Sequence, residues 1–193
     1  VSYHGDIDPL PMKIANTIKA IKIASLFPPR LLIFNCEKVI PDRKQGQLKE
    51  LVNRINKLLR VAKDYEVTLA IEPEPELIIS NTNEALLLLE EINSPYLAVN
   101  LDIGHSYISD ESIVKAIRDL KGRIAHVHLE DIKDKIHKHL VPGEGDINFK
   151  EVFTAFQEIN YKGYFVVDLF NINEDPLILA DRSLKKLREI SMS

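Results

Sequence analysis

Short apolar runs and longer amphipathic segments alternate along this chain, and this alternation restricts the fold more than any other feature. Runs such as 67–72 and 96–102 have the length of β-strands, whereas segment 47–65 carries apolar residues at helical spacing. Strands that alternate with helices are typical of an α/β fold with a parallel sheet. We therefore expect parallel strands, each connected to the next by a helix.

The alternation predicts six strands and six helices. The strands are expected at residues 1–4, 31–36, 67–72, 96–102, 123–129 and 164–169. The helices are expected at residues 12–27, 47–65, 81–92, 111–120, 149–159 and 176–190. Asn81 and Glu84 have the spacing of a capping box, and segment 130–148 is expected to be a long loop. A closed barrel of eight strand-helix units has about 250 residues, so two units are expected to be absent.

Four predicted strands end in a side chain that can bind a divalent metal ion. These side chains are Glu72, Asp102, His128 and Asp168. Parallel α/β sheets and barrels bind ligands at the carboxyl ends of their strands, where residues far apart in the chain converge. Carboxylates and imidazole without thiolates favour Mn²⁺, Zn²⁺, Co²⁺ or Mg²⁺. The sequence therefore predicts one metal site that the four strand ends share.

The alternation of side chains along the strands agrees with this prediction. Thr68 and Ala70 share a strand face with Glu72, and Asn100 shares one with Asp102. Small and polar side chains on the inner face of a barrel leave space for a site. A single acid at a strand end is more often a turn former or a helix cap, and a single histidine is more often a core residue. The prediction therefore depends on the four strand ends taken together.

Composition restricts the class of protein. The chain has 193 residues and is 45% apolar, which is enough for one well-buried core, so we expect a single domain over residues 1–193. A formal net charge of −4 disfavours a nucleic-acid partner. The sequence has no apolar run of membrane-spanning length and no signal-like start, so no membrane partner is expected. Cys36 is the single cysteine, which excludes an internal disulfide and is typical of a cytoplasmic protein.

Four segments resemble the xylose-isomerase-like TIM barrels, a superfamily of sugar isomerases and epimerases that is related to the endonuclease IV type of AP endonuclease. The matching segments are Leu69–Pro73, Asn100–His105, His126–Asp131 and Pro142–Phe149. Their order and spacing agree with the superfamily over nearly the whole chain. The resemblance implies a TIM-barrel-like fold with about six βα units, truncated at the N-terminus so that the chain starts at the third strand.

The resemblance also implies a role for each strand-end residue. Glu72, Asp102 and His128 fall on metal ligands of the isomerases and epimerases. The fourth ligand of those enzymes is normally Glu, which together with Glu72 forms the acid/base pair, whereas this chain has Asp168. Asp is one methylene shorter, so metal binding is expected to survive and the geometry of proton transfer is left open. His105 falls on a histidine that contacts substrate in those enzymes.

The function that this resemblance implies is a divalent-metal-dependent isomerase or epimerase of a small sugar, polyol or keto compound. The metal would hold the substrate carbonyl and a neighbouring hydroxyl, which stabilises the charge of an enediolate. Glu72 and Asp168 would remove and return a proton at the adjacent carbon. His105, Glu130 and Lys133 are the expected substrate-binding residues. For Lys133 the alternative is a solvated run of charges.

Two other functions are left open. An AP-endonuclease-like phosphodiesterase uses three zinc ions, and His4, His105 and His139 are candidates for the additional ligands. Asn35 stands where that branch has a histidine, and His137 stands where it has Asp, which weakens this alternative. The other alternative is an inactive truncated barrel that binds a partner. Open sheet edges need covering, and a homodimer would cover them.

Overall fold

The computed structural model describes residues 14–170 and 173–192, and the predicted strand at residues 1–4 and His4 lie outside these ranges. The chain divides into two compact units, Val1–Asn100 and Leu101–Ser193. Both units contain parallel strands connected through helices, which agrees with the α/β class expected from the sequence. None of the helices in the described ranges is long and apolar enough to cross a membrane.

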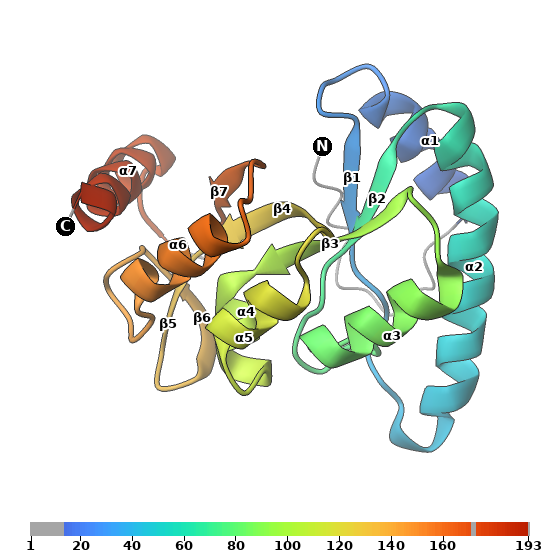
Figure 1. Ribbon diagram of the computed structural model, residues 1–193, viewed down its shortest axis with the longest axis horizontal. Helices are drawn as coiled ribbons and strands as arrows, with labels where there is room; N and C mark the ends of the chain where they lie inside the picture. The colour runs from blue at the N-terminus through green and yellow to red at the C-terminus, as the bar shows by residue number, and fades with distance from the viewer. Residues whose placement is uncertain (1–13, 171–172, 193) are drawn as a thin grey trace. The chain divides into compact units, whose positions relative to one another are not determined.

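The first unit contains a parallel arrangement of three strands (Figure 1). The strands are β1 (Leu31–Phe34), β2 (Thr68–Ile71) and β3 (Leu97–Asp102). The helices are α1 (Ile14–Ala24), the short η1 (Pro41–Arg43), α2 (Lys44–Asp64) and α3 (Thr82–Ile92). In the register of the strands, Ala70 of β2 lies opposite Ile33 of β1 and Ala98 of β3. β3 crosses the boundary between the units, because its last two residues belong to the second one.

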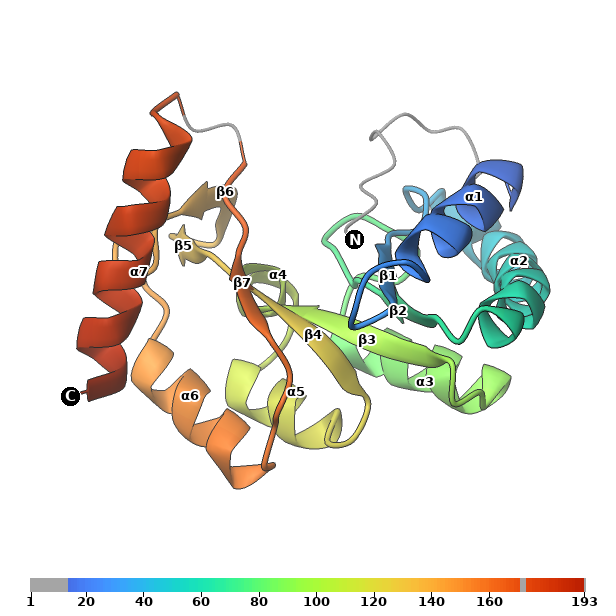
Figure 2. The ribbon, with the colours of Figure 1, turned by 90° about the horizontal axis from the view of Figure 1, so that it is seen from above.

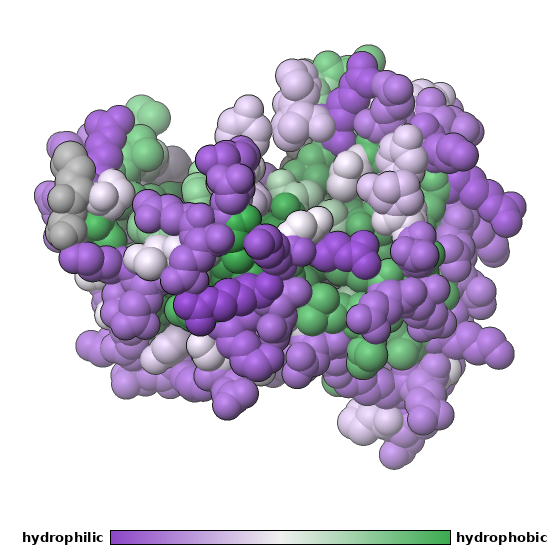
Figure 3. All heavy atoms as spheres, viewed as in Figure 1, coloured by the Kyte–Doolittle hydropathy of each residue, from purple (hydrophilic) through white to green (hydrophobic). Residues whose placement is uncertain are grey.

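Helix α2 lies along one side of these strands because one of its faces is apolar. Its buried apolar residues, at helical spacing, are Leu51, Ile55, Leu58, Leu59 and Ala62. Burying a large aliphatic side chain contributes about 1.5–3 kcal/mol, so this face is a main source of the unit's stability. The opposite face is hydrophilic, which Figure 3 shows as purple at the right-hand edge. The helix begins three residues before its predicted start, since η1 leads directly into it.

The single cysteine lies just beyond β1. Its Sγ accepts a hydrogen bond from the backbone N–H of Ile79 at 3.2 Å. Burial raises the pKa of the Cys36 thiol to about 12, because an apolar environment disfavours the thiolate. Cys36 is therefore a protonated, structural residue.

The second unit contains two parallel strands and a separate antiparallel hairpin (Figure 2). The parallel strands are β4 (Ile124–Leu129) and β7 (Phe165–Val167), and the hairpin strands are β5 (Asp131–Lys133) and β6 (Ile136–Leu140). The helices are α4 (Ile103–Ser109), α5 (Ile113–Asp119), α6 (Phe149–Glu158) and α7 (Pro176–Met192). Aromatic rings join α6 to β7, with the rings of Phe156 and Tyr161 centred 5.0 Å and 5.3 Å from that of Phe165.

Two segments differ from the prediction. Segment 130–148, expected as a loop, contains the β5–β6 hairpin, and the residues after Asp102, expected as a connection, form α4. The hairpin turns through Asp134 and Lys135, whose φ angles are 54° and 55°. Positive φ at both central residues is typical of a type I′ turn, for which Asn-Gly is the usual signal. The Asp-Lys pair carries no such signal, so the sequence pattern did not reveal the hairpin.

Candidate functional site

The first unit contributes Glu72, which follows the last residue of β2. Its side chain is buried, and the amide Nδ2 of Asn100 in β3 donates a hydrogen bond to Glu72 Oε1 at 2.5 Å. A hydrogen bond from a neutral amide orients a buried carboxylate without neutralising it. Asn35, which follows β1, donates its own amide to the carboxylate of Glu74.

The second unit contributes Asp102, the last residue of β3, whose side chain is buried. Its Oδ1 accepts a hydrogen bond from the backbone N–H of His105 at 2.8 Å, which caps the start of α4. Burial alone would raise the pKa of Asp102. The positive charge of His105, a hydrogen bond with Glu130 and the charge of His128 together lower it to about 2. Asp102 is therefore ionised at neutral pH, as a metal ligand must be.

His128 lies near two carboxylates of this unit. Its Nδ1 is 3.8 Å from Oδ2 of Asp102 and 3.5 Å from Oδ2 of Asp168, which follows β7. Both distances exceed those of good hydrogen bonds. They are close to the separation of about 3.4 Å expected between ligand atoms that are each about 2.1 Å from one metal ion. The two acids differ in exposure, since the side chain of Asp102 is 0% exposed and that of Asp168 is 30% exposed. The arrangement thus offers three ligands, one of them open to solvent.

Three histidines form a second group of potential ligands in the same unit. One ring nitrogen of each of His105, His137 and His139 lies within 4.8 Å of those of the other two. The ring centres of His105 and His137 are 4.8 Å apart. His139 also places its Nδ1 2.9 Å from the carbonyl oxygen of Asp168, which connects β6 to the end of β7. His105 and His139 were predicted as additional ligands, whereas His137 was not. The sequence signal for His137 was its spacing of two residues from His139, because this spacing puts both rings on the same face of a strand.

Glu130 lies directly against α4. It is fully buried, and its carboxylate belongs with Asp102 and His105 to a further group whose ligand atoms lie within 4.8 Å of one another. A Cβ atom added to Gly104 would lie 2.0 Å from Glu130 Oε1. The predicted substrate-binding residue Glu130 is therefore enclosed, and α4 can approach it only because position 104 has no side chain.

Asp131 is a structural residue of this region that sequence reasoning missed. Its buried carboxylate accepts hydrogen bonds from the backbone N–H groups of Ile132 at 2.9 Å, Gly143 at 2.9 Å, Gly145 at 2.8 Å and Ile147 at 3.1 Å. The turn at Gly143–Gly145 is thus tied to the start of the hairpin. The two glycines were the available signal, because backbone N–H groups without flanking side chains can approach a buried carboxylate closely.

The lysines of the hairpin lie on its exposed part. Lys133 and Lys135 are both exposed. The Nζ atom of Lys135 is 5.7 Å from the ring centre of Tyr107 in α4, within the range of a cation–π contact. The contact of Lys133 with substrate remains a prediction.

Known proteins resemble this chain in sequence and fold. An inosose dehydratase of Clostridium tetani is 29% identical over 168 residues, which cover 77% of this chain and 56% of that protein. A D-psicose 3-epimerase of Enterocloster bolteae is 30% identical over 134 residues, covering 68% of this chain and 43% of that one. The chain therefore spans about half the length of these curated relatives.

The fold has counterparts among solved structures. The crystal structure of the IOLI protein with a zinc atom superposes with a TM-score of 0.76 at 18% identity, covering 92% of this chain and 68% of that one. The sequence model of the xylose isomerase-like TIM barrel family matches residues 12–190.

Proposed function

Because the chain belongs to the xylose isomerase-like TIM barrel family, we propose that it is a divalent-metal-dependent isomerase or epimerase of a small sugar, polyol or keto compound. The observation that carries this proposal is the position of His128 Nδ1, 3.8 Å and 3.5 Å from the carboxylates of Asp102 and Asp168. Relatives named as a dehydratase of inosose and an epimerase of D-psicose support chemistry on a polyhydroxy ketone.

The proposed metal ligands are Asp102, His128 and Asp168, with Glu72 as the fourth. Glu72 is included because it follows β2, which pairs with β3, the strand that ends at Asp102. The zinc atom of the IOLI protein supports a metal in this fold, and Mn²⁺, Co²⁺ and Mg²⁺ suit the same donor atoms. When bound, such an ion would polarise a substrate carbonyl and make the neighbouring C–H group more acidic.

The side chains then have separate tasks. Glu72, oriented by Asn100, would take the proton from the carbon beside the carbonyl. Asp168 would return a proton, and its partial exposure allows it to exchange that proton with solvent. His105 would bind a substrate hydroxyl, and Lys133 would reach a substrate oxygen from the hairpin. Glu130 was expected to bind substrate, but it is enclosed against α4, so it would act instead by holding Asp102 in place. Because the side chain of Asp168 is one methylene shorter than that of Glu, the substrate would have to lie closer to β7 than it would with Glu at this position.

The first prediction concerns metal content and proton exchange. We expect about one divalent ion per chain after reconstitution, and transfer of deuterium from solvent into D-psicose, D-tagatose or an inosose. Glu72→Gln should reduce this transfer by about 10²-fold or more, because it removes the base. Mass spectrometry measures the transfer, and elemental analysis measures the metal.

Glu76→Gln is the matched control, since Glu76 lies on the same segment as Glu72 but is exposed and pairs with Lys38. It should leave transfer unchanged. The proposal would be abandoned if the reconstituted protein held no metal above background, or if Glu72→Gln transferred deuterium at the original rate.

The group of His105, His137 and His139 favours one alternative function. Three imidazoles can hold a further zinc ion, and an AP-endonuclease-like phosphodiesterase would need such additional metals. That alternative predicts cleavage of abasic DNA and about three metal ions per chain. If neither activity nor metal is found, the remaining alternative is an inactive partner-binding chain. Light scattering would then test for a homodimer.

A further inference from the structure

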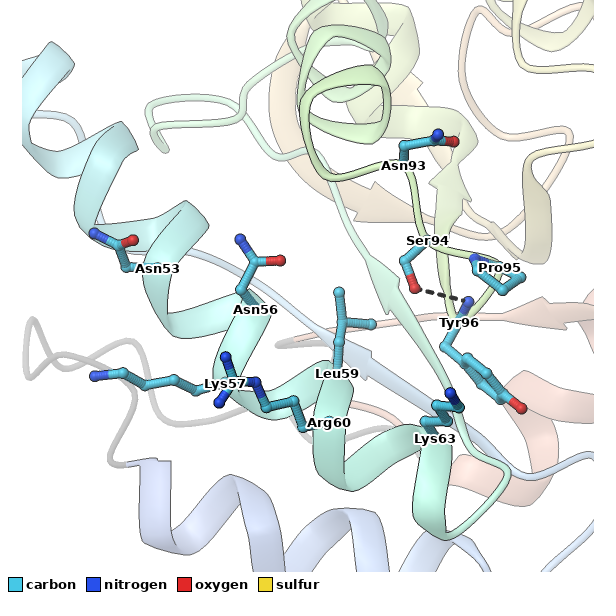
Figure 4. Close-up of a pocket in the computed structure, with 10 residues that line it drawn as sticks. All are labelled: Asn53, Asn56, Lys57, Leu59, Arg60, Lys63, Asn93, Ser94, Pro95 and Tyr96. Atoms are coloured by element: carbon cyan, nitrogen blue, oxygen red, sulfur yellow. Dashed lines mark hydrogen bonds between the residues drawn. The ribbon is translucent and has the colours of Figure 1, made fainter.

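A hollow of about 680 Å³ lies in the first unit between α2 and the segment that connects α3 to β3 (Figure 4). Its volume is within the range of small-molecule sites in proteins, about 300–1,000 Å³. The lining residues are Asn53, Asn56, Lys57, Leu59, Arg60, Lys63, Asn93, Ser94, Pro95 and Tyr96. We call this hollow the basic groove.

The basic groove collects cations that have no acidic partner. Helix α2 carries six lysine or arginine side chains and two acidic ones, a net charge of +4 in a chain whose net charge is −4. Two cations outside the groove pair with acids, Lys44 with Glu84 and Arg54 with Glu37. The three cations that line the groove form no ion pair with any described residue, and no lining residue is acidic. The groove therefore has a positive potential, which favours an anion.

The other lining groups suit an anion with several oxygens. The amides of Asn53, Asn56 and Asn93 can each donate hydrogen bonds. Ser94 Oγ accepts a hydrogen bond from the backbone N–H of Tyr96 at 3.2 Å (Figure 4). This leaves the hydroxyl proton of Ser94 free to donate to another acceptor. Leu59, which Figure 4 shows between the helix and the connecting segment, is only 8% exposed and gives the groove an apolar floor.

We propose that the basic groove binds a phosphate monoester of a small organic molecule. Three cations match the two negative charges of a phosphate monoester better than the single charge of a carboxylate. Leu59, Pro95 and the ring of Tyr96 would contact the organic part. A neutral sugar would not need this concentration of charge.

The groove lies at the opposite end of the strands from Glu72. Tyr96 immediately precedes β3, whereas Glu72 immediately follows β2, which runs parallel to β3. A ligand in the groove would therefore not compete with a substrate at Glu72. The proposal is independent of the proposed isomerase or epimerase function.

Isothermal titration calorimetry of the whole chain at constant ionic strength tests the proposal. The probes are inorganic phosphate, phenyl phosphate, ribose 5-phosphate and AMP. We expect one saturable site, with phenyl phosphate tighter than inorganic phosphate because of the apolar floor. Comparison of the affinities for ribose 5-phosphate and AMP shows whether the groove prefers a sugar phosphate or a nucleotide.

Variants show where the phosphate binds. The double variant Arg60→Gln/Lys63→Gln should weaken binding about tenfold or more. Lys49→Gln removes an exposed cation of α2 outside the groove and should not change affinity. Asp102→Asn should also keep the binding, which separates it from the strand-end residues. No saturable binding, equal losses in Lys49→Gln and the double variant, or full affinity in a folded double variant would each overturn the proposal.

Discussion

Gly104, which has no side chain, determines how closely α4 approaches Glu130. Gly104 lies in the first turn of α4, where an added Cβ would lie 2.0 Å from Glu130 Oε1 and 2.8 Å from Cγ1 of Ile132. Neither neighbour can retreat easily, because both are fully buried. The glycine is therefore a condition for the enclosed position of Glu130.

A pair of glycine variants tests this point. We expect Gly104→Ala to lower the free energy of unfolding by about 1–3 kcal/mol or more, because the new methyl group overpacks a buried site. Gly46→Ala is the matched control, since Gly46 lies in α2 with no atom within 4 Å of an added Cβ. It should stabilise the chain by about 0.5–1 kcal/mol, because alanine favours the helix. Urea denaturation measures both changes, and equal effects would contradict the explanation.

The sequence predicted which charged side chains of the site lie close together. Asp102, His128 and Asp168 were identified because each ends a predicted parallel strand, and the structure brings them together. Their role as metal ligands remains a prediction. Asp131 was missed because its partners are backbone N–H groups, which carry no sequence signature apart from the two glycines.

The start of α3 shows how local interactions define an element. Asn81 Oδ1 accepts the backbone N–H of Glu84 at 3.0 Å, which confirms the predicted cap. The carboxylate of Glu84 accepts the backbone N–H of Ser80 at 2.7 Å instead of that of Asn81, and also binds Lys44. The capping box is therefore displaced by one residue and joined to the start of α2.

This arrangement predicts a pH dependence. Burial alone would raise the pKa of Glu84, but hydrogen bonds from Lys44 and Ser80 lower it below its ordinary value of 4.5. A carboxyl with a lowered pKa in the folded state stabilises the fold above its ordinary pKa. This contribution is lost as the pH falls through the lowered value. We therefore expect the free energy of unfolding to decrease more steeply below pH 4.5 in the unchanged chain than in Glu84→Gln.

Chemical denaturation at a series of pH values measures this difference. Glu90→Gln, on an exposed part of the same helix, is the control and should follow the unchanged chain. Parallel curves for the unchanged chain and Glu84→Gln would contradict the assigned role of Glu84.

The strands and helices predicted from residue 31 onward all begin and end within three residues of their expected bounds, because periodicity and flanking turn signals mark each of them. The short α4 was missed because it follows β3 directly, with no turn residues between strand and helix to mark its start. Its cap is Asp102, a residue interpreted only as a strand end.

On the scale of the whole molecule, β3 belongs to both compact units. Its residues Leu97–Val99 pair with β2 in the first unit, and Leu101 and Asp102 begin the second. The predicted single domain requires that the two units unfold together. We expect one cooperative transition, because the two units share β3. Unfolding of one unit would release β3 and so disrupt the other unit as well.

Hydrogen exchange monitored by mass spectrometry in increasing denaturant tests this prediction. Peptides from β2 and from β4 should lose protection at the same denaturant concentration. Loss of protection in one unit at clearly lower denaturant would show two domains instead of one.

The half-buried Cys36 thiol gives the chain its own reporter of changes around β1. At neutral pH the thiol stays protonated, since its pKa is raised to about 12, so alkylating reagents react with it slowly while β1 and Ile79 remain in place. The chain has one cysteine, so each chain takes up at most one label, and the labelling rate reports how accessible Cys36 is. Binding of a ligand to the first unit can therefore be followed as slower labelling, without a dye, a tag or an engineered residue.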